Sequence, residues 1–323
     1  MISSFRIKPY NIYFNDRREK LMNTFKANQN DDNQSLFKFL KKNYKTTPLS
    51  VIYKWLRKGD IKINGKRIKD KDYLIKANDE IIVYDNNKPV LRDDFKKITN
   101  YDIDVIYEDS NLLIVKKPYN LEVHSPVKTS MDDIVKNYLF DTKQYNPSEE
   151  NSYVISHIHR LDKLTSGLIM YAKNKQTHDI MVEAIQDKEK IEKYYRCRID
   201  VPVTESLIAK GWIKYDPVIQ KSVFSEDFRS DYKEATTIFN VVSLDVTNEQ
   251  TELEVQILTG RKHQIRATLE YYGASIINDS RYSGTIINNE KMIFLFANKL
   301  VFNGFEGNLE NLNGKIIEIE PTW

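Results

Sequence analysis

The stretch SHIHRLDKLTSGLIMYAKN, Ser156 to Asn174, decides how the larger part of this chain folds. A His-Arg-Leu-Asp tetrad that ends at Asp162 is followed by a polar turn up to Gly167, and an apolar run, Leu168 to Ala172, comes directly after it. Glycine permits a sharp backbone turn, and a short apolar run of this kind predicts a buried strand. Because the strand fixes the direction of Asp162, the stretch predicts one anionic side chain held at the floor of a cleft.

The simplest interpretation of Asp162 is that it caps the turn or pairs with a neighbouring base, since surface ion pairs are common and contribute little. A second segment, LTGRKHQIRATLEYYGASIINDSRY from Leu258 to Tyr282, argues against this interpretation. The two segments resemble the two long motifs of the RluA-type pseudouridine synthases, which isomerise uridine in ribosomal or transfer RNA. The resemblance runs in order from about Tyr101 to the C-terminus, through IYEDSNLLIVKKPYNLEVH (106–124) and KIEKYYRCRID (190–200).

The resemblance implies a catalytic site made of Asp162, Tyr195 and Arg266. Asp162 supplies an ionised carboxylate, as nucleophile or as base, and Arg266 pairs with it and holds its pKa low. Tyr195 stacks beside the uracil and assists proton transfer at C5, with the adjacent Tyr194 as the alternative residue. No cofactor is expected, because the reaction involves no oxidation, group transfer or energy input and the chain has no P-loop or GxGxxG motif.

The resemblance assigns substrate binding to five further residues: Arg160, His159, Ile265, Arg261 and His263. The target uridine must leave its stack at a cost of a few kcal/mol, and Arg160 occupies the vacated place or holds the flipped nucleotide. Ile265 packs under the base, and His159 orients the turn by hydrogen bonding rather than acting as a base. His157 and His159 lack the further ligands that a metal ion needs, so no metal site is expected.

Several positions depart from the family pattern. Asn120 stands where glycine usually follows Lys-Pro, but asparagine tolerates a left-handed backbone. Lys262 replaces a small hydroxyl residue, Ala267-Thr268 replaces Val-His, and Asn278 replaces the glycine before Asp279. None of these removes a group assigned to catalysis, so the departures concern the details of the RNA contacts.

Residues 35–84 predict a small module of two helices, a hairpin and a strand. SLFKFLKKN and SVIYKWLRKG place their apolar residues on one helical face, with Ser35 and Ser50 as N-caps and Gly59 as the end. IKINGKRI has Asn64-Gly65 between alternating apolar residues, which is the strongest short hairpin signal, and the strand IIVY follows. This order resembles the S4-like RNA-binding domain.

Positive charge is concentrated in the same module. The whole chain has a net charge of +3, whereas residues 35–84 contain 13 Lys and Arg and 5 Asp and Glu, a local +8 that leaves 3 − 8 = −5 for the remainder. A basic module on a mildly acidic body predicts that the module attracts phosphates. The alternative is a solvated face without a partner. The cations assigned to RNA binding are Lys54, Arg57, Lys58, Lys62, Lys66 and Arg67.

The 323 residues therefore predict four regions: an N-terminal extension (1–34), the S4-like domain (35–84), a linker (85–100) and a catalytic domain (101–323). The catalytic domain is expected to be α+β, around a mixed and largely antiparallel sheet. A membrane span and a signal peptide are not indicated, so a cytoplasmic protein is expected. The single cysteine, Cys197, excludes an internal disulfide and is interpreted as a core residue. A monomer is expected, and no protein partner is implied.

The function expected is an RNA pseudouridine synthase that acts on large-subunit (23S) ribosomal RNA. The choice of RNA rests on the S4-like module and on the likeness of SVIYKWLRKGDIKINGKRIK (50–69) to the RluC-type members. The alternatives are a transfer RNA pseudouridine synthase and a non-catalytic RNA-binding factor in ribosome assembly. Retention of Asp162, Arg266 and a tyrosine argues against the second alternative.

Overall fold

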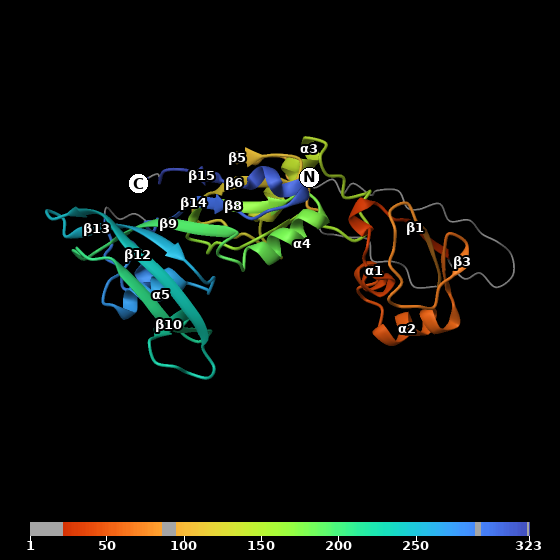
Figure 1. Cartoon of the computed structure of the whole chain (residues 1–323), viewed down its shortest axis with the longest axis horizontal. Coiled ribbons are helices and arrows are strands. Elements are labelled where there is room, and N and C mark those ends of the chain that lie inside the picture. The colour runs from red at the N-terminus through yellow and green to blue at the C-terminus, as the bar shows by residue number, and fades with distance from the viewer. Residues whose placement is uncertain (1–21, 86–94, 288–291, 322) are drawn as a thin grey trace. The chain divides into compact units, whose positions relative to one another are not determined.

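The computed structural model describes residues 22–85, 95–287, 292–321 and 323, and the strand-like alternation between Phe5 and Phe14 lies outside them. The chain divides into two compact units (Figure 1). The first contains residues 1–98, 136–155 and 174–176, and the second contains residues 99–135, 156–173 and 177–323.

The first unit contains a four-stranded sheet and two helices, which Figure 1 draws in red and orange. The strand order is β1-β4-β2-β3 among the described residues, with antiparallel pairing throughout. Its elements are β1 (Met22–Lys26), η1 (Gln29–Asp31), α1 (Leu36–Asn43), α2 (Leu49–Lys58), β2 (Ile61–Ile63), β3 (Lys66–Arg67) and β4 (Glu80–Tyr84). The two helices, the hairpin and the closing strand therefore follow the predicted order.

Capping side chains and residues with positive φ determine where several of these elements end. The Ser35 side chain caps α1 by accepting a hydrogen bond from the Lys38 backbone N–H, and Gly59 ends α2 in the left-handed conformation at φ 71°. Asn64 (φ 49°) and Gly65 (φ 79°) both have positive φ, as a two-residue hairpin turn requires. The prediction that Ser50 caps the second helix is wrong, because this helix begins at Leu49 after Pro48 and has no side-chain cap.

Strand β1 extends the first unit beyond the boundary expected at residue 35. Phe25, from this strand, is buried and packs edge-on against Phe39 of α1, with ring centroids 5.4 Å apart. Tyr44 makes a similar contact with Trp55 of α2 at 4.9 Å. Aromatic contacts of this kind add to the stability that burial provides, so residues 22–34 contribute to the core of the basic module.

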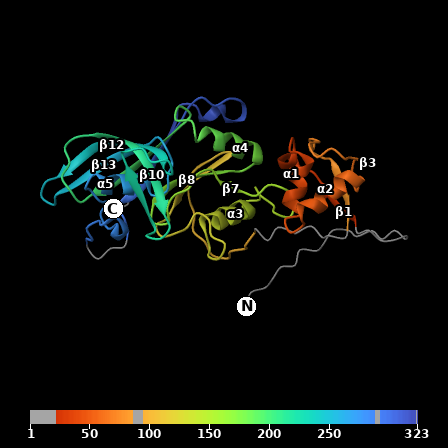
Figure 2. The same ribbon diagram turned by 90° about the horizontal axis from the view of Figure 1, so that it is seen from below.

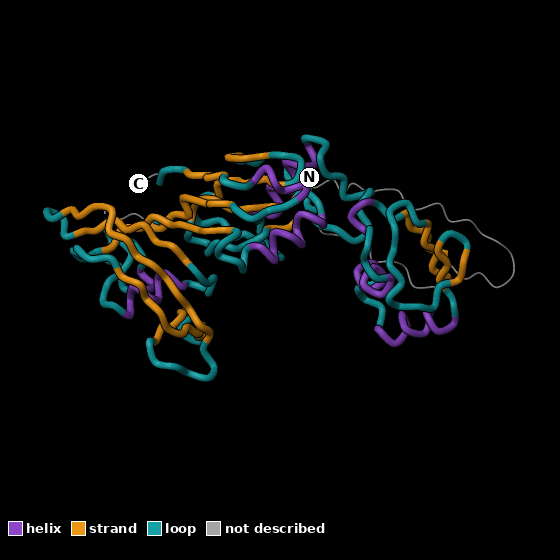
Figure 3. The backbone as a smooth tube through the Cα atoms, in the orientation of Figure 1, coloured by secondary structure: helices purple, strands orange, loops and turns teal. Residues whose placement is uncertain are grey.

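The second unit is built on a large sheet that is almost entirely antiparallel, and strands dominate it in Figure 3. Its strands are β5 (Asp104–Glu108), β6 (Leu112–Lys117), β7 (Ser156–His157), β8 (Ser166–Ala172), β9 (Ile191–Ile199), β10 (Leu207–Asp216), β11 (Lys221–Ser225), β12 (Lys233–Asp245), β13 (Gln250–Ile257), β14 (Leu295–Phe302) and β15 (Lys315–Glu318). The described strands follow the order β11-β10-β12-β13-β9-β14-β8-β6-β5, with β15 beside β14 and β7 beside β8. Only the pairing of β14 with β8 is parallel among these strands, and the α+β expectation is confirmed.

The remaining elements are helices and 3₁₀ turns. They are α3 (Met131–Asp141), which is divided between the two units, and α4 (Lys175–Ala184), α5 (Gln264–Tyr271), η2 (Ser280–Tyr282) and η3 (Gly307–Leu312). Helix α5 packs on β11 and β12, and Figure 2 shows it against this part of the sheet. The apolar run after Gly167 is the buried strand β8, in which all seven residues are buried.

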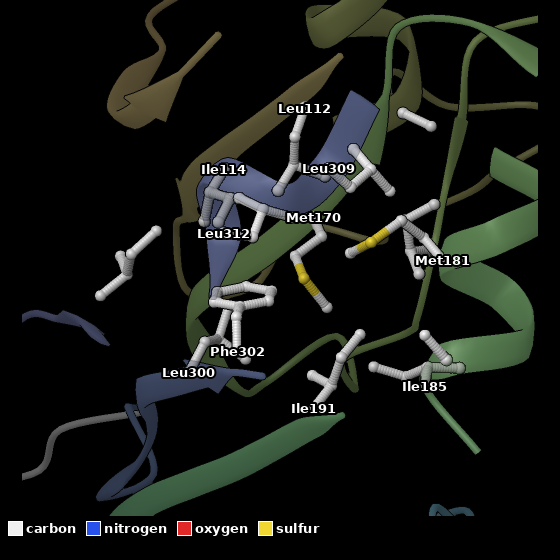
Figure 4. Packing of buried hydrophobic residues seen from close by; sticks show 14 of the residues in the cluster. Leu112, Ile114, Met170, Met181, Ile185, Ile191, Leu300, Phe302, Leu309 and Leu312 are labelled. Carbon is white, nitrogen blue, oxygen red and sulfur yellow. The ribbon is translucent and has the colours of Figure 1, made fainter. Parts of the chain in front are cut away.

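Side chains from several elements form the hydrophobic core of the second unit, shown in Figure 4. Met170 of β8 and Met181 of α4 both lie within it, and both are fully buried. The apolar spacing of residues 175–188 predicts a helix with Ile180, Met181, Ala184 and Ile185 as its buried stripe. Ile180 is 36% exposed, so this prediction is wrong for Ile180. Thr177 is buried instead, because the inward positions of the helix are Thr177, Met181 and Ala184.

Gly167 places β8 directly against β14. A Cβ atom at this position would lie 2.2 Å from the Ala297 carbonyl oxygen, and the φ angle of +113° is itself open mainly to glycine. Asn120 adopts a φ of 62°, so asparagine does support the left-handed turn after Lys117-Pro118. Both turns lie next to the segment that carries Asp162.

Candidate active site

Asp162 lies in the turn between β7 and β8, and buried groups hold this turn in place. The Asp162 carbonyl accepts a hydrogen bond from the Thr165 backbone N–H at 3.1 Å. Lys117, at the end of β6, is fully buried, and its Nζ donates to the carbonyls of Lys163 (3.2 Å), Pro118 (2.8 Å) and Leu121 (2.8 Å). The three N–H donors of one ammonium group therefore join the Asp162 turn to the loop after β6.

The environment of Lys117 favours neither charge state strongly. Burial lowers the pKa of Lys117 to about 7, and the negative charge of Asp162 opposes this decrease. The three carbonyl acceptors match the ammonium form, which has three N–H donors. Sequence reasoning noted Lys117 only as part of the Lys-Pro pair, because no pattern in the chain indicates that its side chain would turn back toward residue 163.

Arg266, on α5, forms its tightest contacts with Asp279. Its Nε and Nη2 donate to the two carboxylate oxygens at 2.6 and 2.7 Å, and both side chains are at most 2% exposed. Nη1 of the same guanidinium lies 3.6 Å from Asp162 Oδ2. The structure thus brings Arg266 to Asp162 as the resemblance implies, and adds Asp279 as a bidentate partner that sequence reasoning did not assign.

The expectation that Arg266 holds the pKa of Asp162 low is wrong in its net effect. Burial raises the pKa of Asp162, and the positive charges of Arg266 and Lys262 only partly oppose this increase. The negative charge of Asp279 raises the pKa of Asp162 further. A carboxylate whose ionised form is poorly solvated is more reactive toward protons and carbon centres than one that is stabilised by a close ion pair.

His263, at the start of α5, also faces Asp162. Its Nε2 lies 3.8 Å from Asp162 Oδ2, and its Nδ1 lies 2.9 Å from the Tyr282 hydroxyl. The Ser222 backbone N–H donates to the oxygen of that hydroxyl at 2.7 Å, whereas the Ser222 carbonyl is 3.4 Å away. Both His263 Nδ1 and the Ser222 carbonyl therefore lie within hydrogen-bonding distance of the Tyr282 hydroxyl. Burial, followed by the positive charge of Arg266, lowers the pKa of His263 to about 3, so the ring is neutral.

Strand β9 separates the two candidate tyrosines onto opposite faces. Tyr195 is buried, and burial followed by the charge of Asp162 raises the pKa of its hydroxyl. Tyr194 points to the other face, where its hydroxyl donates to Glu192 and the ammonium of Lys299 lies 4.3 Å from its ring centroid. The alternation of side chains along a strand thus places Tyr195, and not Tyr194, on the side of Asp162.

The remaining predicted substrate residues differ in burial and in hydrogen bonding. The backbone N–H of Met170 donates to His159 Nε2 at 3.4 Å, and burial lowers the pKa of His159 to about 3, so the ring is a neutral acceptor. Arg160 is exposed, and Ile265 is buried in the first turn of α5. The Nε of Arg261 donates to the Glu234 carbonyl at 2.8 Å, so this guanidinium braces the loop before α5.

The six cations assigned to RNA binding lie in the first unit, on or beside α2 and the β2–β3 hairpin. Five of them are exposed, and the sixth, Lys62, is half-buried with its Nζ 5.3 Å from the Tyr84 ring centroid. Exposed cations are available for phosphate contacts. Within the described ranges, no group of three or more His, Cys, Asp or Glu residues could hold a metal ion. In the same part of the chain, no helix has the length and apolar character needed to span a bilayer.

Comparison with known proteins shows the family to which the chain belongs. Residues 111–271 match the family model described as RNA pseudouridylate synthase, and residues 36–81 match the S4 domain. An uncharacterized RNA pseudouridine synthase from Mycoplasma capricolum subsp. capricolum is 48% identical over 304 residues, which cover 94% of this chain and 99% of the relative. The chain belongs to the RNA pseudouridylate synthase family, and the protein is an RNA pseudouridine synthase.

Two further relatives have names that state an RNA substrate. Ribosomal large subunit pseudouridine synthase C from Buchnera aphidicola subsp. Baizongia pistaciae is 28% identical over 292 residues, which cover 88% of this chain and 87% of the relative. The mitochondrial tRNA pseudouridine(32) synthase from Saccharomyces cerevisiae is 27% identical over 288 residues, which cover 86% of this chain and 54% of the relative.

Proposed function

We propose that this enzyme converts specific uridines of large-subunit ribosomal RNA to pseudouridine, with Asp162 as the catalytic carboxylate. The position of Asp162 supports this catalytic role. Its turn is held by the hydrogen bond from Lys117 to the Lys163 carbonyl, and its Oδ2 lies 3.6 Å from the buried guanidinium of Arg266. The ribosomal substrate is favoured because the match to the large-subunit enzyme covers most of both chains, whereas the match to the tRNA enzyme leaves almost half of that protein uncovered.

The reaction breaks two bonds, C1′–N1 and C5–H, and forms two, C1′–C5 and N1–H. The bond between ribose C1′ and uracil N1 breaks, the base turns, and C1′ joins C5, after which C5 loses its proton and N1 gains one. Asp162 takes part either as a nucleophile or as a base that starts the cleavage. Burial that raises its pKa increases its basicity, and Arg266 compensates part of its charge in the ionised state.

Tyr195 and Arg160 have separate roles in this proposal. We assign the Tyr195 ring to stacking beside the uracil. Burial and the charge of Asp162 raise the pKa of its hydroxyl, so the hydroxyl stays protonated and can assist proton transfer at C5 only as a hydrogen-bonding group. Arg160 is exposed next to the Asp162 turn, where a guanidinium can stack against the bases that the flipped uridine leaves behind. Stacking and phosphate contacts offset the cost of a few kcal/mol for extruding the base.

A map of pseudouridines in ribosomal and transfer RNA, from cells that lack the protein, tests the substrate. We expect sites in large-subunit RNA to lose the modification and to regain it with the wild-type gene but not with Asp162→Asn. Loss only in transfer RNA would assign the alternative substrate. Unchanged maps in both RNA classes would instead favour a role in ribosome assembly without modification.

The basic surface of the first unit makes a separate prediction. Replacing Lys54, Arg57 and Lys58 of α2 with glutamine removes three exposed charges. We expect the slope of log affinity against log salt to become shallower by about 2–3, since each phosphate contact contributes roughly 0.7–0.9. Binding of ribosomal RNA at several salt concentrations measures this slope.

A charge-retaining variant provides the matched control. Lys54→Arg, Arg57→Lys and Lys58→Arg together keep the three charges, so the slope should stay at the wild-type value. If the glutamine variant also keeps the wild-type slope, the surface of α2 does not contact phosphates, and the anchoring charges lie elsewhere.

A further inference from the structure

Lys262 is an exposed cation in the turn that precedes α5. Its Nζ lies 3.2 Å from the centroid of the Tyr215 ring, at the end of β10, which is a close cation–π contact. Its backbone is fixed as well, because the Lys262 carbonyl accepts a hydrogen bond from Ser222 Oγ at 2.6 Å. The aromatic ring and the fixed backbone together hold the ammonium group in one place.

No carboxylate of the described residues lies within 4.0 Å of this ammonium group, which sets it apart from neighbouring lysines. Lys214, one residue before Tyr215, pairs with Asp231, and Lys221 of β11 pairs with Glu270. An aromatic face attracts an ammonium group but does not neutralise it. The charge of Lys262 is therefore available to an anion that approaches from solvent.

Contacts connect this cation to the catalytic centre. The Tyr215 ring packs edge-on against His263 with centroids 5.9 Å apart, and His263 Nε2 lies 3.8 Å from Asp162 Oδ2. The positive charge of Lys262 lowers the pKa of both Asp162 and His263. Lys262 thus lies within electrostatic range of Asp162, on an exposed part of the same site.

We propose that Lys262, held by Tyr215, binds a backbone phosphate of the target nucleotide. A uridine whose ribose reaches Asp162 carries a phosphate on each side of the sugar, and these anions must approach the two carboxylates Asp162 and Asp279. An unpaired cation at the edge of the site favours that approach. The family motif usually has a small hydroxyl residue at position 262. A contact between the Lys262 ammonium group and a phosphate would therefore differ from what that motif allows. The inference rests on the proposed role of Asp162.

The test uses the full-length protein and unmodified large-subunit ribosomal RNA made by transcription in vitro. Lys262→Ser is expected to raise KM about tenfold, the size of one charge-assisted contact, with a smaller change in kcat. The salt slope of RNA binding should become shallower by about 0.7–0.9, as for one lost phosphate contact. Lys262→Arg should restore both values, and Tyr215→Leu should raise KM in the same direction.

Lys214→Ser is the matched control, because Lys214 lies beside Tyr215 but pairs with Asp231; it should leave KM and the salt slope unchanged. Unchanged KM and salt slope in Lys262→Ser, with only the acid limb of kcat moved to higher pH, would overturn the proposal and leave Lys262 with an influence on Asp162 alone. Wild-type protein without turnover would instead count against the proposed substrate. The binding slope would still test Lys262 in that case, because it does not depend on turnover.

Discussion

Asp162→Asn is expected to reduce the turnover of uridine by about 10²- to 10⁴-fold, the range for loss of one acid–base group, while RNA affinity should stay within about twofold of wild type. Asparagine has the shape of aspartate but no negative charge, so it neither attacks carbon nor takes a proton. The Asp162 side chain is 24% exposed and sits in a turn held by backbone hydrogen bonds, so the fold tolerates the change. Tritium released from RNA labelled at uracil C5 measures the turnover.

The same variant should keep or raise the stability of the fold although it loses activity, and this stability serves as a control for folding. Burial raises the pKa of Asp162, so its ionised form is destabilising in the native state at neutral pH. The variant should therefore melt at or above the wild-type temperature at pH 7–8, and the difference should shrink as the pH falls through the raised pKa toward 3.8, the ordinary pKa of an aspartate. Turnover within tenfold of wild type in such a well-folded variant would assign catalysis to another group.

Asp279→Asn lowers the free energy of unfolding by about 3–5 kcal/mol, the usual cost of breaking a buried ion pair by removing one partner. The guanidinium of Arg266 is 2% exposed and loses the negative charge that it contacts through two hydrogen bonds. Chemical denaturation of the full-length protein measures the change. Turnover should fall as well, because the released guanidinium is free to move toward Asp162 Oδ2.

Two comparisons make this prediction specific. Asp162→Asn removes only the 3.6 Å contact of the same guanidinium and should not destabilise the protein. The double variant Arg266→Met with Asp279→Leu replaces the pair with apolar groups and should recover much of the lost stability, but not the activity. A loss below about 1 kcal/mol in Asp279→Asn would mean that Asp162 or water takes over as the partner of Arg266.

The sequence predicts best those features that depend on neighbouring residues. Asn64-Gly65 specifies its hairpin turn because both residues tolerate positive φ, and the alternation along β9 is sufficient to place Tyr195 opposite Tyr194. The prediction that Ser50 is the cap is wrong because the helix starts at Leu49, two residues earlier than a cap at Ser50 would place it, with Pro48 in the N-cap position. The prediction that Ile180 is buried is wrong because tertiary contacts, and not the local sequence, decide which apolar residues of α4 face the core.

The centre of the candidate site depends on contacts that no local pattern encodes. Arg266 is a predicted partner of Asp162, yet its two short hydrogen bonds go to Asp279, which reaches it from beyond the end of α5. Lys117 is 46 positions from Lys163, whose carbonyl it contacts. The net direction of the pKa shift of Asp162 follows from burial and the charge of Asp279, which outweigh the charges of Arg266 and Lys262, so the sequence alone leads to the wrong sign.

The parallel contact between β14 and β8 also concerns the order in which the enzyme becomes active during synthesis. Gly167 and Ala297 are paired in this contact although they are 130 positions apart. Contacts of such high sequence separation form late, because the long loop between them must close first. Strand β8, which follows the Asp162 turn, pairs with β6 from earlier in the chain, but it acquires β14 as its second neighbour only when almost the whole chain has left the ribosome. The basic module near the N-terminus is synthesised first. A growing chain would bind RNA before it is able to modify it.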